Sequence, residues 1–131
     1  MIEKDIHYEL TDDTDVGALV GNRVYPLKLP QGWTLPAITY QLVSNERAHT
    51  LAGPSGRVRP RFQIDCWDDD YEDVKTLATA VRQCLDGFKD DSNTESDIGG
   101  ITLVGERDIW EEQIKLFRIS MDFIIPHFET P

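Results

Sequence analysis

The sequence predicts an α+β fold: a mostly antiparallel sheet of about five strands, packed by one main helix and a short N-terminal helix. Three observations predict it. Apolar residues alternate in several separate segments, a single long helical stripe lies over residues 71–85, and one long helix can connect at most one pair of parallel strands. The 131 residues show no internal repeat, so we expect a single domain over 1–131.

The N-terminal region is expected to be helical and then extended. Ile2, Ile6 and Leu10 are spaced four apart, which predicts a short helix with one apolar edge. The following "TDDTDVGALVG" offers Thr and Asp as caps, a further helical turn, and Gly21 as its end. Three prolines in residues 22–36 exclude a helix there and predict an edge strand followed by an irregular crossing.

Alternating polarity predicts the remaining strands. "AITYQLVS" (37–44) alternates, as does "RVRPRFQIDCW" (57–67), and the polar segment 45–56 between them is expected to be a long hairpin loop or arm. "ITLVGERDIW" (101–110) and "IKLFRISMDFII" (114–125) are expected to form a final hairpin. The order is therefore helix, three strands, helix, two strands.

Six acidic residues lie between Asp65 and Asp73, with no basic residue among them, just before the main helix. Asp70 precedes Asp73 by three residues, and Asp69 precedes Glu72 by three, so either pair fits a helix cap. A calcium loop needs a glycine at its turn and a distal Glu at fixed spacing, and this segment has neither. Helix capping is the favoured interpretation, with a metal site as the alternative.

The overall charge limits the partners. With 13 basic and 24 acidic residues the net charge is −11, which repels DNA and anionic membranes. No apolar run is long enough to span a bilayer, and the acidic start does not resemble a secretion signal. Cys66 and Cys84 are expected to be core residues without a disulfide, because a helix separates them. We find no motif for catalysis, cofactor or metal binding, so the chain is not expected to be an enzyme.

Two features are unusual for a monomer. Arg57, Arg59 and Arg61 follow one another on the polar side of a predicted strand. They could be a solvated face that protects a strand edge, or a docking stripe for the acidic surface of a neighbouring copy. Trp67 lies on the same outward side and could be an interface anchor, although partial burial against the fold would explain it equally well.

Three elements in order carry a resemblance to a known family: the "GNRVYP…PQG…LPAITY" entry, the "RFQIDCW" strand and the "YEDVKTLATAVRQCLDG" helix. Together with the closing "DIWEEQIKLFRISMDFII", they resemble the tail-completion proteins of long-tailed bacteriophages and prophages, also called head-to-tail joining or tail-terminator proteins. The resemblance covers nearly the whole chain.

The resemblance implies a structural virion protein without cofactors, located at the head-tail junction after assembly in the host cytoplasm. It implies a homo-oligomeric ring, usually a hexamer, that caps the tail tube and contacts both the tail tube protein and a head-side neck or connector protein. DNA would pass through the lumen without specific binding, and no membrane is involved. The arm that contacts the tube or neck would include Asn45, Glu46, Arg47, His49 and Leu51, and the subunit interface would include Arg57, Arg59, Arg61 and Trp67.

Two alternatives stay open. Another neck component, such as a head-closure or stopper protein, would also be small, but such proteins tend toward barrels with little helix. A cytoplasmic binding adaptor, or a small monomeric enzyme, is the alternative from a different class.

Overall fold

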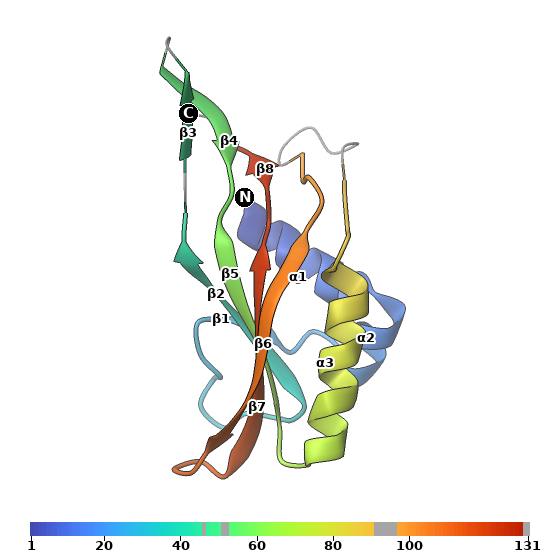
Figure 1. The fold of residues 1–131 in the computed structure, drawn as a ribbon. Coiled ribbons are helices and arrows are strands. Elements are labelled where there is room, and N and C mark those ends of the chain that lie inside the picture. The colour runs from blue at the N-terminus through green and yellow to red at the C-terminus, as the bar shows by residue number, and fades with distance from the viewer. Residues whose placement is uncertain (46, 51–52, 91–96, 130–131) are drawn as a thin grey trace.

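The main sheet has five strands in the order β1-β2-β5-β7-β6 (Figure 1). This computed structural model describes residues 1–45, 47–50, 53–90 and 97–129. The strands of the main sheet are β1 (Val24–Pro26), β2 (Ala37–Ser44), β5 (Arg61–Asp68), β6 (Thr102–Glu111) and β7 (Leu116–Ile124). Three of the four neighbouring pairs are antiparallel, and only β1 runs parallel to its neighbour β2. The predicted α+β class and mostly antiparallel sheet are confirmed.

Three helices cover one face of this sheet (Figure 1). They are α1 (Ile2–Asp12), α2 (Thr14–Val20) and the main helix α3 (Tyr71–Leu85). The apolar stripe of α3 is buried, and the predicted N-terminal stripe of α1 is buried with it. These helices pack on the apolar side of the central strands, which contributes Ile38, Tyr40, Phe62, Ile64, Cys66, Ile119, Met121 and Phe123. One core therefore lies between the helices and the sheet.

Local signals in the sequence set the ends of these helices. The side chain of Asp13 accepts hydrogen bonds from the N–H groups of Asp15 and Val16 and so caps α2. Gly21 follows the last residue of α2 with a φ of 59°, and Gly87 lies just beyond α3 with a φ of 85°. Glycine adopts these left-handed angles without steric cost, so both helices end where the sequence predicts.

A second, smaller sheet contains β3 (Arg47–Thr50), β4 (Gly53–Val58) and β8 (His127–Phe128), in the order β3-β4-β8. The β3–β4 hairpin extends beyond the end of the main sheet (Figure 1). The arm expected over 45–56 is thus largely a β-hairpin, apart from Glu46, Leu51 and Ala52, which lie outside the described residues.

The prediction of one continuous strand over 57–67 is wrong in one respect, because the structure divides this segment between two strands. β4 ends at Val58 and belongs to the small sheet, whereas β5 begins at Arg61 in the main sheet. Pro60 lies between them and has no N–H to give to a ladder, although its C=O accepts from Ile125 at 3.0 Å. At Gly56, with a φ of 84°, a Cβ would lie 2.6 Å from the Phe128 ring, so the chain needs glycine where it passes β8.

Candidate assembly surfaces

The face of the main sheet that the helices leave uncovered, called here the open face, carries a network of charged and polar side chains. In the antiparallel register of β5 and β7, Gln63 lies opposite Asp122, and Asp65 opposite Ser120. The Oδ2 atom of Asp65 accepts hydrogen bonds from Gln63 Nε2 at 2.9 Å and from Arg118 Nη1 at 3.2 Å. A charged network therefore crosses the centre of the sheet.

This network is buried more deeply than an ordinary solvent-facing side. Asp65 is 4% exposed and Ser120 is fully buried. Within the described part of the chain, four buried atoms of the network have no hydrogen-bond partner: Asp65 Oδ1, Arg118 Nε, Ser120 Oγ and Asp122 Oδ1. A buried polar group without a partner costs about 1–3 kcal/mol, so apolar side chains here would serve folding better. The open face therefore carries polar chemistry that stability alone does not require.

Trp67 is on the open face, as its register predicts, but it is not a freely exposed anchor. Its Nε1 donates to Thr39 Oγ1 at 2.9 Å, and the guanidinium of Arg118 lies 5.1 Å from the centre of its ring. Such a cation–π contact positions both groups. Of the two interpretations of Trp67, partial burial within the fold is thus the one that applies to the single chain.

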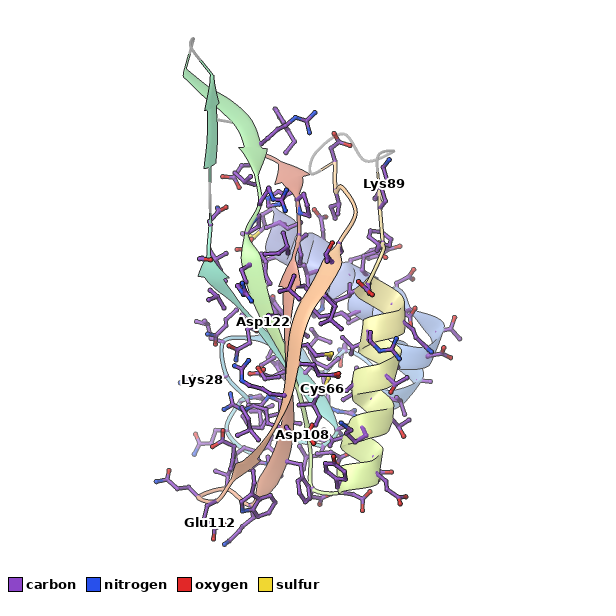
Figure 2. The ribbon with its side chains drawn as sticks, in the orientation of Figure 1. Lys28, Cys66, Lys89, Asp108, Glu112 and Asp122 are labelled. Atoms are coloured by element: carbon purple, nitrogen blue, oxygen red, sulfur yellow. The ribbon has the colours of Figure 1, made fainter. Side chains whose placement is uncertain are left out.

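A cavity of about 310 Å³ lies next to this network. The crossing segment after β1 forms one wall with Leu27, Leu29 and Trp33, and the sheet forms the other with Asp65, Trp67 and Arg118. The irregular crossing predicted from the prolines therefore creates a mixed apolar and charged recess on the open face. Figure 2 labels Lys28 in this segment.

The three arginines of the predicted docking stripe do not lie on a single strand. Arg57 is on β4, Arg59 falls between the strands, and Arg61 begins β5. Arg57 and Arg59 are exposed, but Arg61 is partly covered and its Nε lies 3.3 Å from Asp122 Oδ2. The structure thus uses Arg61 within the chain and leaves Arg59 at the surface.

The residues of the predicted docking arm are spread over the hairpin and its entrance. Asn45 is half-buried directly after β2, and Arg47 and His49 belong to β3. Glu46 and Leu51 lie outside the described residues.

The acidic cluster before α3 is explained mainly by helix capping. Asp70 is the N-cap, and its Oδ2 accepts the N–H of Asp73 at 3.0 Å. Asp69 precedes this N-cap and is not itself the capping residue; its N–H donates to Asp68 Oδ1. Burial raises the pKa of Asp68 from its ordinary value. Among the described residues, no group of three or more His, Cys, Asp or Glu side chains could hold a metal ion.

An ion-paired contact that the sequence did not predict joins β6 to α3. Asp108 on β6 accepts a hydrogen bond from the Tyr71 hydroxyl at 2.6 Å and another from Lys75 Nζ at 3.2 Å. These bonds lower the pKa of Asp108, the Tyr71 bond being the larger cause, and the bond to Asp108 raises the pKa of Lys75. Figure 2 shows Asp108 beside α3. The only signal in the sequence was that Tyr71 and Lys75 lie four residues apart, on one face of the predicted helix.

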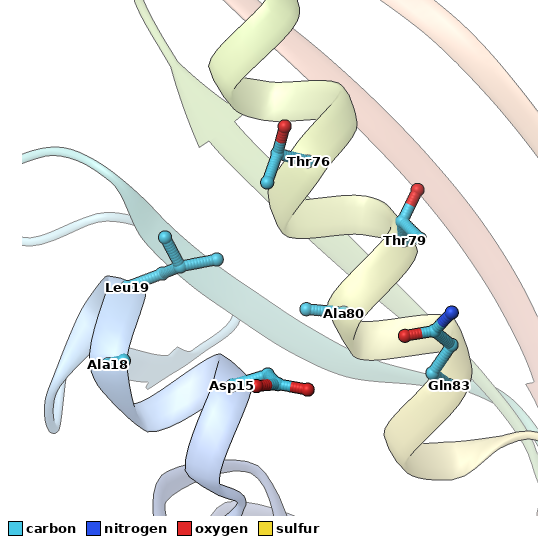
Figure 3. A pocket seen from close by; sticks show the side chains of 7 residues that line it. All are labelled: Asp15, Ala18, Leu19, Thr76, Thr79, Ala80 and Gln83. Carbon is cyan, nitrogen blue, oxygen red and sulfur yellow. The ribbon is translucent and has the colours of Figure 1, made fainter.

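A shallow groove separates α2 from α3 on the outside of the helical layer (Figure 3). Its volume is about 480 Å³, and both apolar and polar side chains line it: Asp15, Ala18, Leu19, Thr76, Thr79, Ala80 and Gln83. The hydroxyls of Thr76 and Thr79 bond to backbone carbonyls within α3. These groups are not arranged for proton transfer or nucleophilic attack.

The cysteines are free thiols without activation for catalysis. Cys66 is fully buried, and burial raises its pKa well above the ordinary value. Burial also raises the pKa of Cys84 to about 12, with the charge of Asp13 as the next cause. Both thiols therefore stay protonated near neutral pH and are poor nucleophiles.

The family model of the tail completion protein gp17 matches residues 4–126. The chain belongs to the tail completion protein gp17 family. This confirms the resemblance carried by the entry segment, the β5 strand and the α3 helix. The family is structural and non-enzymatic, which agrees with the expectation that the chain is not an enzyme.

Comparison with solved structures shows the same fold in a chain described as "Virion of native gene transfer agent (GTA) particle". The two chains superpose with a TM-score of 0.71 at 20% sequence identity, covering 94% of this tail completion family member and 91% of the other chain. No curated protein matches the chain. Among the described residues, the structure has no helix that is long and apolar enough to cross a membrane.

Proposed function

We propose that this chain is the subunit of a hexameric ring that ends tail-tube growth and joins the tube to the neck beneath the capsid. The family match over residues 4–126 carries this proposal. The fold that the chain shares with a chain of a gene transfer agent virion supports it. The protein would then be a virion component at the head-tail junction, with the tail tube protein and a head-side connector protein as partners.

The charge distribution supports head-to-tail association of copies. Residues 16–64 carry six basic residues and one acidic residue, whereas the rest of the chain carries seven basic and 23 acidic residues. Opposite charges on different parts of one chain favour contacts between unlike surfaces of neighbouring copies. Contacts of that kind generate rings when the rotation between copies closes.

Within this ring, the exposed Arg59 and Arg57 would contact the acidic surface of the next subunit, with Arg61 beside them at the start of β5. Trp67 would contribute to the interface at the other end of β5. The predicted docking arm, with Asn45, Glu46, Arg47, His49 and Leu51, would contact the tube or the neck. The remaining acidic surface suits a lumen through which DNA passes, because like charge prevents adhesion.

Electron microscopy of the purified protein, alone and mixed with its tail tubes, tests this function. We expect rings, or a cap at one end of each tube, and the images would give the number of copies. Arg59→Glu should reduce the fraction of capped tubes at least tenfold, because it reverses a charge at the proposed contact. Lys89→Glu, the same charge reversal at an exposed residue after α3, is the matched control and should leave capping unchanged. Monomers that ignore the tubes would contradict the proposal.

A further inference from the structure

The two edges of the main sheet differ in how well they are protected. β1, at one edge, has three residues and ends in Pro26, which cannot donate a hydrogen bond. β6, at the other edge, has ten residues and contains no proline. Short strands and prolines are common ways of preventing further strand pairing at an edge. β6 is therefore the edge of this sheet that is able to accept another strand.

The register shows which backbone groups of β6 point outward. The N–H of Ile125, directly after β7, donates to the C=O of Pro60, so odd-numbered residues of β7 bond toward β5. Alternate residues bond to opposite sides, so even-numbered residues of β7 bond toward β6. From Gly105 onward, their partners on β6 are Gly105, Arg107, Ile109 and Glu111. The residues between these partners direct their N–H and C=O groups outward: Glu106, Asp108 and Trp110.

These outward groups form a short, firmly held docking edge. In the described part of the chain, none of the three has a backbone hydrogen bond outside the ladder. Near the start of β6, the N–H of Leu103 is already taken by Asp86 Oδ1 at 3.0 Å. Near its end, the C=O of Glu111 accepts from Lys115. The hydrogen bonds that Asp108 accepts from Tyr71 and Lys75 hold the middle of the strand against α3. The free edge thus extends from Glu106 to Trp110.

We propose that this edge binds β3 of a second copy of the chain, so that the main sheet of one subunit continues into the hairpin of the next. The inference rests on the ring of the proposed function and names the surfaces that build it. The outer backbone edge of β3 would make this contact, in addition to the contact of the docking arm with the tube or neck. β3 is the outermost strand of the small sheet, and its four residues fit within the five-residue free edge of β6. The hairpin that carries β3 extends away from the main sheet of its own chain, where a neighbour can reach it (Figure 1).

Charge favours β3 over a second β6 as the partner. Residues 102–111 contain three acidic residues and one arginine, whereas β3 contains Arg47 and no acidic residue. Pairing two β6 strands would bring Glu106 and Asp108 of both copies together, and like charges across a ladder are destabilising. Pairing β6 with β3 joins unlike surfaces, and this heterologous contact can close into a ring.

Proline substitution at an outward N–H tests the added strand. Glu106→Pro removes one donor of the docking edge and leaves the ladder to β7 intact, because proline is tolerated where the N–H of an edge strand faces solvent. We expect the fraction of capped tubes to fall at least tenfold, with the far-UV circular dichroism of the free chain unchanged. Glu106→Ala removes the same side chain but keeps the N–H, and it should cap within about twofold of the wild type.

Cysteine cross-linking tests the partner independently of any folding defect. A chain carrying both Ala48→Cys and Arg107→Cys should give a ladder of disulfide-linked oligomers when assembled caps are oxidised, whereas the wild type and each single variant should not. Disulfide-linked dimers of the Arg107→Cys single variant would instead show β6 paired with β6 and would overturn the proposal. If the Glu106→Pro variant still caps tubes and the double-cysteine variant gives no ladder, the proposed strand pairing is wrong, whereas the proposed function is unaffected. If the wild-type protein caps no tubes, both the proposed function and the proposed strand pairing are contradicted.

Discussion

The helix-covered face of the main sheet and its open face are both buried at their centres, but they are filled with different chemistry. The first contains Phe62, Ile64, Met121 and Phe123 against the helices. The open face, formed by the alternate residues of the same strands, contains polar side chains, among them the buried Asp65. Apolar packing specifies the fold on one side, whereas the other side retains charged groups that are costly unless each is paired. The two faces of one sheet are thus filled by side chains of opposite character.

The largest effect is expected on the helix-covered face. Phe123 is fully buried, and Phe123→Ala should lower the free energy of unfolding by about 3–5 kcal/mol through lost burial and the cavity that remains. Ile124→Ala, at the next and only half-buried position, is the control and should cost about 1 kcal/mol. Urea denaturation of both variants measures the difference. Equal losses would show that the two faces contribute alike to stability.

A smaller loss is expected on the open face, where charges are paired. Arg118→Met keeps an unbranched side chain over Trp67 but leaves the buried Asp65 carboxylate without its cation, which should cost about 2–3 kcal/mol. Adding Asp65→Asn removes the unpaired charge and should restore more than half of that loss. A double-mutant cycle measured by denaturation gives the coupling. Additive losses would show that the two residues do not act as a pair.

Much of the fold was accessible from sequence because its signals are local. Alternation in residues 37–44 and 114–125 predicted β2 and β7, and the stripe over 71–85 predicted α3 to the residue. Asp70 was one of two predicted caps, and the N–H that it accepts decides between them. Periodicity and capping depend on neighbours within four residues, so a single sequence contains them.

The candidate surfaces were less accessible, because they depend on contacts between distant segments. The alternation placed Asp65 outward, but its burial follows from Arg118, which is 53 residues away. The split at Pro60 depends on β8 attracting β4 into a second sheet. The contact of Tyr71 with Asp108 spans 37 residues and has no motif. The arm residues, which have no core pattern, could be assigned a role only through the family resemblance.

At the edge strand β6, we expect the two faces to differ less in how much their side chains contribute to stability. Asp108 tests this expectation. Its side chain projects to the helix side yet stays exposed, where it bonds Tyr71 and Lys75. Asp108→Asn keeps an acceptor for Tyr71 but loses the ion pair, so we expect a loss of about 0.2–0.5 kcal/mol at pH 7, as for other solvent-screened pairs. This is a tenth of the effect expected in the core.

The pH dependence of this last effect separates the ion pair from packing. Because Tyr71 and Lys75 stabilise the carboxylate, the pKa of Asp108 in the folded chain lies below its ordinary value of 3.8. A depressed pKa contributes stability that is present above pH 3.8 and is lost as the pH falls through the lowered pKa. The difference in unfolding free energy between the wild type and Asp108→Asn should therefore disappear on acidification. If the difference in unfolding free energy between the wild type and Asp108→Asn stays constant with pH, the contact stabilises β6 by packing. The helix-covered face would then extend fully to the edge strand.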